Sequence, residues 1–537
     1  MPGRMEFNLS LSRSSAPRIP NRGPEGPPGS GPMRLLVMGD FSALPASQKP
    51  ALAGRPTHRV DLDTLDTVMQ RLAPQLDLPA GTLAPAALDD FHPDALVRHL
   101  PAFAALRDLR RRLLDPAQFA QAVAQLQQGA GPTTAPTTGP PTGPPTGPSS
   151  GPHQPGAAVH SDDGLLAQLL GGKPAGLAAP APPAATGIDA FIRSIVAPHT
   201  VPNIAPQQAT WLASVDSAMA EALRAVLHAP AFQALESAWR GVQWLISSLE
   251  LDEDLQLHLF DVSRDELLAD VAAARGQIDQ TGVYAALVDR WRNQPGAAGW
   301  TALVGLYCFG PQQADIGLLA ALGMLASQVG GPFLAAGSLD LAGGGTAAAG
   351  AELPVAEVSG AEVSDAEVSG ADLPGAGRAP ALAGWQALRR SEVAPFIGLA
   401  APRVLLRLPY GKAADPIEAF KFDELAATPD PEQFLWGNGA LACALLIGRA
   451  FSAKGWGFEP GDQREITDLP AYTVLRDGER ELQACAEHYL GEQGGQALLA
   501  AGLMPVLSHR HANAVTVLRF QSVALPAATL AGLSVSR

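Results

Sequence analysis

The chain has 537 residues, a net charge of -15 at pH 7, 17% charged residues, 55 glycines and 49 prolines. Single cores stop growing near ~250 to 300 residues, so this length predicts two or three packed units, diluted by low-complexity segments. The acidic balance provides no basic field to attract phosphate, which excludes a general nucleic-acid binder. Three widely spaced cysteines, Cys308, Cys443 and Cys485, imply no disulfide framework and fit a reducing compartment.

Residues 1–32 are rich in Pro, Gly and Ser and are expected to form a flexible arm. Within it, residues 6–12 alternate between apolar and polar side chains and are a candidate edge strand. The stretch has no apolar run and no cleavage-site pattern, so we expect no secretory signal and a cytoplasmic protein.

The first folded pattern follows this arm. Residues 34–41 predict an apolar strand that is closed by a Gly-Asp turn. Val60 and Leu62 suggest a short second strand, and Asp63 is placed to cap the helix that comes next. Further helices are expected beyond it, with a break at Pro116.

An acidic motif, DDFHPD, spans residues 89–94 and comes directly before a predicted helix. Its three carboxylates and His92 suggest a metal site, but no second His or Cys stands at ligand spacing. We therefore favour helix capping, with Asp89 or Asp90 on free N–H groups and Asp94 in the first turn.

Three segments of this region carry a resemblance: LLVMGDFS, RVDLDTLDTVMQRLAP and LDDFHPDALVRHLPAFAALRDLRRRLLDP. They resemble the small subunit of the bacterial type VI secretion contractile sheath, in which a Gly-Asp turn, an Asp-rich helix start and DDFHPD follow in this order. The resemblance implies a small-subunit-like (TssB-like) module over residues 33–126. Its arginine cluster at residues 107–112 is interpreted as an exposed helix face.

Residues 127–187 hold a Pro/Thr/Gly tract that cannot bury enough apolar area to fold, so a disordered linker is expected. GPSSG at residues 147–151 matches the nucleophile-elbow pattern. No strand precedes it and no helix follows it, as that chemistry requires, so we expect no catalytic serine there.

Residues 188–339 alternate helical and strand patterns. Strands are expected at residues 255–262, 300–310 and 332–338. Ser263 and Glu266 form a capping box that opens a helix after the first of these strands. The alternation of strands with helices predicts an α/β sheet.

Residues 340–380 interrupt this pattern with GGGTAAAG and a pentapeptide repeat. The repeat is too polar for a core and too short for a solenoid, so a surface loop is expected. GGGTAAAG lacks the GK[ST] that would bind phosphate and magnesium, so we expect no phosphate loop.

Residues 381–537 continue the folded pattern. We expect a strand buried on both faces within residues 402–412, and a helix with a broad apolar stripe after Glu432. That helix falls short of the ~20 apolar residues that a bilayer span needs, so we expect no membrane insertion. Residues 516–522 are a second candidate edge strand.

Tryptophans at apolar helical positions are expected to be core anchors rather than cofactor platforms. They are Trp239, Trp244, Trp385, Trp436 and Trp456. His509 and His511 share one face of an expected strand, but the sequence offers no third ligand, so we expect no zinc site.

The second half of the chain resembles the large (TssC-like) subunit of the same sheath. The matching segments include LHAPAFQALESAWRGVQWLI, DVSRDELLADV, ALVGLYCFG, GPFLAAGS, GLAAPRVLLRLPYGK and FLWGNGALACALLIGRAFSAKGW. The tail, residues 465–537, departs from the family after the Gly-Leu-x-Pro step at residues 502–507, because 30 residues replace its long closing arm.

The resemblance implies an α/β fold in which two sheath-type modules are joined by a disordered linker, and the large module is a mixed sheet covered by helices. It implies a structural subunit that surrounds an inner tube and contracts to drive protein translocation. The implied partners are other sheath subunits, the inner tube protein, the baseplate and an AAA+ disassembly ATPase.

No enzyme activity, catalytic residue, cofactor or metal is implied. The shortened tail and the repeat loop leave an alternative open, in which the chain is a non-polymerising accessory or cap protein that binds the sheath or baseplate.

Overall fold

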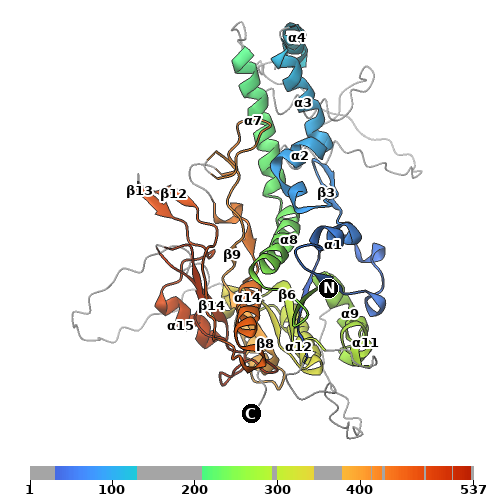
Figure 1. The fold of residues 1–537 in the computed structure, drawn as a ribbon, viewed down its shortest axis with the longest axis vertical. Coiled ribbons are helices and arrows are strands. Elements are labelled where there is room, and N and C mark those ends of the chain that lie inside the picture. Colours follow the sequence, from blue (N-terminus) through green and yellow to red (C-terminus); the bar gives the residue numbers. More distant parts are fainter. Residues whose placement is uncertain are drawn as a thin grey trace, which may run out of the picture.

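The computed structural model describes residues 31–115, 117–129, 208–292, 299–343, 378–412, 414–425, 430–476, 479–510 and 512–533. Most of the expected N-terminal arm, most of the linker and most of the loop at 340–380 lie outside these residues. We call residues 31–129 the N-terminal part and residues 208–533 the C-terminal part. Together they form a sheet-containing body from which a helical arm projects (Figure 1).

A mixed nine-stranded sheet forms the centre of the body. Its strands run in the order β11 (Glu465–Ile466), β15 (Val515–Val517), β14 (Met504–Ser508), β8 (Ile397–Ala401), β7 (Phe333–Gly337), β6 (Ala302–Phe309), β1 (Met33–Gly39), β5 (Leu255–Asp261) and β2 (His58–Val60). From β14 to β5 all neighbours are parallel, and the remaining pairs are antiparallel. The predicted α/β class with a mixed sheet is confirmed.

Both faces of the sheet are buried. Side chains alternate along a strand, so Leu35 and Val37 of β1 enter one core while Leu36 and Met38 enter the other. The first core is covered by α1 (Leu65–Leu72), α8 (Pro230–Ser248) and α14 (Gly439–Lys454). The second is covered by α9 (Arg264–Ala273), α12 (Gln313–Val329), α13 (Arg378–Arg389) and α15 (Glu492–Ala501), with the short α10 (Gly282–Tyr284) and α11 (Arg290–Arg292) nearby.

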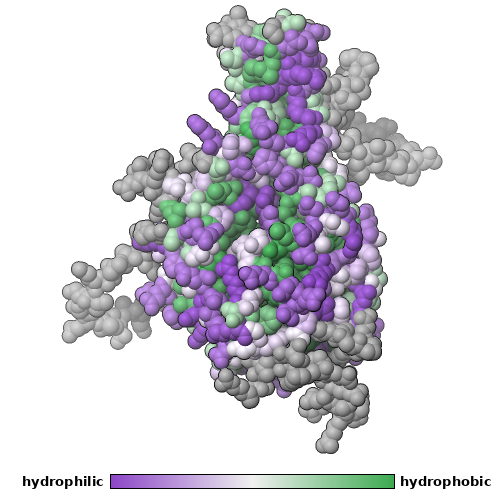
Figure 2. Space-filling model, in the orientation of Figure 1, coloured by the Kyte–Doolittle hydropathy of each residue, from purple (hydrophilic) through white to green (hydrophobic). Residues whose placement is uncertain are grey.

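The arm combines helices from both parts of the chain (Figure 1). They are α2 (Pro93–His99), α3 (Pro101–Leu114), α4 (Phe119–Gly129) and α7 (Gln208–Leu227). Hydrophilic side chains gather along the α3 side of the arm (Figure 2). Arg107 and Arg111 are exposed there as predicted, whereas Arg110 is partly buried and its Nε lies 2.7 Å from Asp216 Oδ1 of α7.

Among the described residues, three two-stranded sheets lie outside the large sheet. They are β3 (Leu76–Leu78) with β4 (Gly81–Leu83), β9 (Val404–Leu405) with β10 (Trp436–Gly437), and β12 (Thr473–Arg476) with β13 (Glu479–Leu482). No helix among the described residues is long and apolar enough to cross a membrane.

The buried strand expected within residues 402–412 is present as the short β9, but it pairs with β10 outside the large sheet. The large sheet uses β8 instead, which ends at Ala401 because Pro402 has no N–H for a ladder. One predicted element is shifted. The helix predicted after Glu432 begins only at Gly439, where the Asn438 side chain accepts a hydrogen bond of 2.9 Å from the N–H of Ala440. The apolar residues just before it form β10 instead.

Three local predictions, about a helix cap, a strand end and a free edge, are wrong. Asp63 does not cap α1: Thr64 is the N-cap, and the carboxylate that accepts from its N–H is Asp61, at 2.9 Å. Leu62 is 70% exposed and lies beyond β2. The candidate edge at residues 516–522 is not free either, because β15 pairs with β11 on one side and β14 on the other.

Candidate functional interface between the two parts

Strand β1 belongs to the N-terminal part, yet both of its neighbours come from the C-terminal part. It pairs with β5 along its whole length, from Met33 opposite Leu255 to Gly39 opposite Asp261, and its other edge pairs with β6. The N–H of Arg34 also donates to Thr301 Oγ1 at 3.0 Å. The N-terminal part therefore supplies a central strand, not an added edge.

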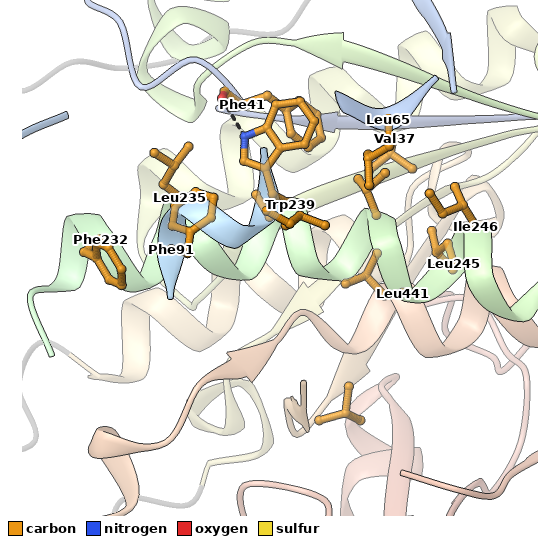
Figure 3. Close-up of a cluster of buried hydrophobic side chains, with 14 of the residues drawn as sticks. Val37, Phe41, Leu65, Phe91, Phe232, Leu235, Trp239, Leu245, Ile246 and Leu441 are labelled. Carbon is orange, nitrogen blue, oxygen red and sulfur yellow. Dashed lines mark hydrogen bonds between the residues drawn. The ribbon is translucent and has the colours of Figure 1, made fainter. Parts of the chain in front are cut away.

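Trp239 of α8 anchors the chain where β1 ends (Figure 3). It is fully buried, its Nε1–H donates to the carbonyl oxygen of Phe41 at 2.9 Å, and the two rings meet edge to face at 5.3 Å. The prediction that Trp239 is a core anchor is confirmed. The structure adds that its partner lies in the other part of the chain.

Asp261 fastens the turn that follows β1. Its Oδ1 accepts from the N–H groups of Phe41 and Ser42 at 2.8 and 3.1 Å, and its Oδ2 accepts from Ser42 Oγ at 2.7 Å. Since Asp261 is the last residue of β5, the carboxyl ends of two parallel strands are joined by one side chain.

Lys49, Arg55, Asp261 and Glu266 form a group that we call the ionic latch. Lys49 Nζ lies 3.4 Å from Asp261 and 3.3 Å from Glu266, and Arg55 Nη2 lies 2.7 Å from Glu266. Burial opposes the charge of Lys49, but Asp261 and the other nearby carboxylates outweigh it and raise its pKa. Burial likewise opposes the charge of Glu266, but hydrogen bonds from Arg55 and the N–H of Ser263 lower its pKa. Lys49 and Glu266 are therefore both charged at neutral pH.

The latch fills the edge of the sheet where α/β proteins commonly bind small molecules, outside the carboxyl ends of the parallel strands. Its two cations come from the N-terminal part, and Asp261 and Glu266 come from the C-terminal part. Lys49 Nζ also lies 2.6 Å from Asp40 of its own part. The Ser263 and Glu266 capping box, predicted from the sequence, is present, and it orients Glu266 toward Arg55. This edge of the sheet joins two parts of the chain.

The acidic motif makes a second contact across the interface. Asp90 Oδ2 accepts from the N–H groups of Ala86 and Ala87, as the capping interpretation expects. Asp94 lies in the first turn of α2 as predicted, but its carboxylate accepts from the N–H groups of Glu418 and Ala419, each at 3.0 Å. These donors are remote in sequence, so no local pattern indicates them.

A buried ion cluster positions the loop that Asp94 binds. Arg407 Nε lies 2.8 Å from Glu236 of α8, and Arg407 Nη1 lies 2.8 Å from Glu424. Burial opposes ionisation of Glu236, but Arg407 and then Arg240 outweigh it and lower its pKa. Tyr410 accepts a hydrogen bond of 2.8 Å from Arg240, and the rings of His92 and Tyr410 pack in a T shape with their centroids 5.0 Å apart. Sequence reasoning missed this cluster, since its members are spread over nearly two hundred positions.

No group of three or more His, Cys, Asp or Glu residues in the described part of the chain could hold a metal ion. His509 Nε2 lies 2.9 Å from Thr516 Oγ1, whereas His511 and the GPSSG and GGGTAAAG motifs, apart from Gly343, lie outside the described residues. His92 accepts a hydrogen bond of 3.2 Å from the N–H of Asp94.

Family comparisons match both parts. The model described as EvpB/VC_A0108, tail sheath N-terminal domain, matches residues 209–352 and 360–524, which is more than half of the chain. The model described as type VI secretion system, VipA, VC_A0107 or Hcp2, matches residues 31–129. The chain therefore belongs to the type VI secretion sheath family and joins a TssB-like module to a TssC-like module. The family is one of structural sheath proteins and not an enzyme family.

A named relative agrees. The chain is 31% identical over 323 residues to the type VI secretion system sheath protein TssC1 of Pseudomonas aeruginosa. The match covers 59% of this chain and 61% of that protein. The interface described above is thus the contact between the two modules, made here within one polypeptide.

Asp94→Asn tests the second contact. The amide keeps the size of the side chain but removes the charge that two N–H groups share, so we expect a loss of roughly 1 to 3 kcal/mol in the free energy of unfolding. Hydrogen exchange in residues 414–425 should rise with it. Asp89→Asn is the control, since Asp89 belongs to the same motif but is exposed. This substitution should change neither the free energy of unfolding nor the hydrogen exchange.

Cleavage of the connection tests whether the interface is sufficient by itself. A protease site at Thr142 lies in the segment between the two modules. Because β1, the latch and Asp94 hold the parts without it, both halves should co-elute on size exclusion after cutting. Separation into two independent peaks would refute an autonomous interface.

Proposed function

We propose that this chain is a structural subunit of the type VI secretion contractile sheath, which assembles around an inner tube and contracts to drive protein translocation. It works in the cytoplasm with other sheath subunits, the inner tube protein, the baseplate and an AAA+ disassembly ATPase. It carries no catalytic residue, cofactor or metal. We propose residues 33–126 as the small-subunit-like module, and residues 188–339 with 381–537 as the large one.

The observation that carries this proposal is the insertion of β1 between β5 and β6. It makes the two modules a single folded body that shares one large sheet. A lattice of such bodies holds the two modules at a ratio of one to one, and the arm of α2, α3, α4 and α7 projects from each body as a separate surface for contacts (Figure 1). The ion pairs at the carboxyl edge of the sheet leave that edge occupied by the chain itself.

Electron microscopy of the purified full chain tests the proposal. We expect hollow tubes with a helical repeat, because a sheath subunit polymerises through contacts between identical copies. Small discrete particles at every salt and protein concentration would refute polymerisation and support the accessory or cap role. Co-purification with an inner tube protein then tests the partner.

A further inference from the structure

Every contact between the two modules described above is made by residues of 31–129 with residues of 208–533. Strand pairing, the Trp239 hydrogen bond, the ionic latch and the Asp94 contact are all noncovalent. None of them requires that both modules belong to the same copy of the chain. The same interface can therefore form between two copies.

The ends of the connecting segment lie on the same arm. Gln208 Nε2 at the start of α7 donates to the carbonyl oxygen of Leu113 at the end of α3, at 2.7 Å, and Arg110 pairs with Asp216 along the same helices. A short connection would be enough for pairing within one copy. The actual segment, residues 130–207, has 78 residues.

The length of this segment exceeds the size of the body. A chain of 78 residues can span at most ~260 to 280 Å. A globular body of about 400 residues has a radius of gyration of roughly 21 Å. The segment is thus long enough to reach a docking site on an adjacent copy, and on copies beyond it.

We propose that the N-terminal module of one copy also docks into the C-terminal module of a neighbouring copy, with β1 of the first between β5 and β6 of the second. The contacts are the same in both arrangements, so exchange loses none of them. Where copies are packed side by side, as the proposed function requires, neighbouring docking sites compete with the chain's own site. Neighbouring subunits then become linked by the chain itself.

Cross-linking between differently tagged copies tests this exchange. One copy carries Arg110→Cys and the other Asp216→Cys, and both carry Cys308→Ser because Cys308 is exposed. The copies are expressed together and treated with a short bismaleimide. We expect a product that contains both tags at several times the level of a control pair of Arg107→Cys and Asp216→Cys. Arg107 lies on the same helix but is exposed to solvent.

A second pair, Asp94→Cys and Glu418→Cys, reports on the other end of the interface. Docking brings both pairs together at once, so both mixed products should rise together. A chance contact between packed neighbours would raise one product without the other. As a positive control, both cysteines of a pair are placed on a single chain. A cross-link within that chain shows that the reagent reaches both positions. Mixed products no higher than the Arg107 control for both pairs would overturn the exchange. Tubes that form without mixed products would refute the exchange and leave the sheath function standing.

Discussion

Trp239→Ala should lower the free energy of unfolding by ~3 to 5 kcal/mol and greatly reduce soluble protein, because it empties a fully buried indole site at the junction of α8 and β1. The loss has two sources: the cavity that the substitution leaves, and the carbonyl oxygen of Phe41, which loses its hydrogen-bond donor. Denaturant unfolding followed by circular dichroism measures it. A variant that unfolds at the wild-type midpoint would show that Trp239 does not anchor the interface.

Two further variants make the comparison sharp. Trp239→Phe keeps a ring but not the N–H donor, so it separates the hydrogen bond from the packing. Trp244→Ala is the matched control on the same helix, because Trp244 is only partly buried. We expect a clearly smaller loss for both than for Trp239→Ala.

Arg407→Met should cost ~3 to 5 kcal/mol at pH 7.5, since it leaves Glu236 and Glu424 buried without their shared cation. The matched control is Arg111→Met. Arg111 pairs with Asp108, and the two side chains are 78% and 43% exposed, so water replaces the lost partner of Asp108. We expect less than ~1 kcal/mol there.

The pH dependence of the Arg407→Met defect has a definite sign. In the wild type the pKa of Glu236 lies below its unfolded value, so its stabilisation is present above the unfolded pKa and is lost as pH falls through the folded one. Without Arg407, only Arg240 opposes the effect of burial on Glu236, so the pKa of Glu236 rises relative to the wild type and the variant takes up protons more readily. The difference in free energy of unfolding between the wild type and the variant should therefore become smaller as the pH falls from 7.5 to 5. A gap that widens would contradict this account.

The sequence predicts the strands and helices of the body well where their signal is local. The apolar run at β1, the capping box of α9 and the alternation from β5 to β7 all follow from neighbouring residues. The predicted core role of Trp239 is of the same kind. Each depends on spacing within one turn or one strand.

The sequence does not predict which elements pack against each other, because these neighbours are far apart along the chain. A strand that is apolar on both faces is expected to be buried, but the pattern does not say between which strands. The insertion of β1 between β5 and β6 joins residues more than two hundred positions apart. Asp94 shows the same limit, because its position in the first turn of α2 was predictable while its donors, Glu418 and Ala419, were not.

The placement of β1 also determines how the body responds to a pull. An edge strand peels away one hydrogen bond at a time, whereas β1 is bonded on both sides and fixed at its end by Asp261. A force along the strand must shear many bonds together. Tension applied to one module would therefore pass to the other through the centre of the sheet, and the joint between the modules should be among the last parts of the body to yield.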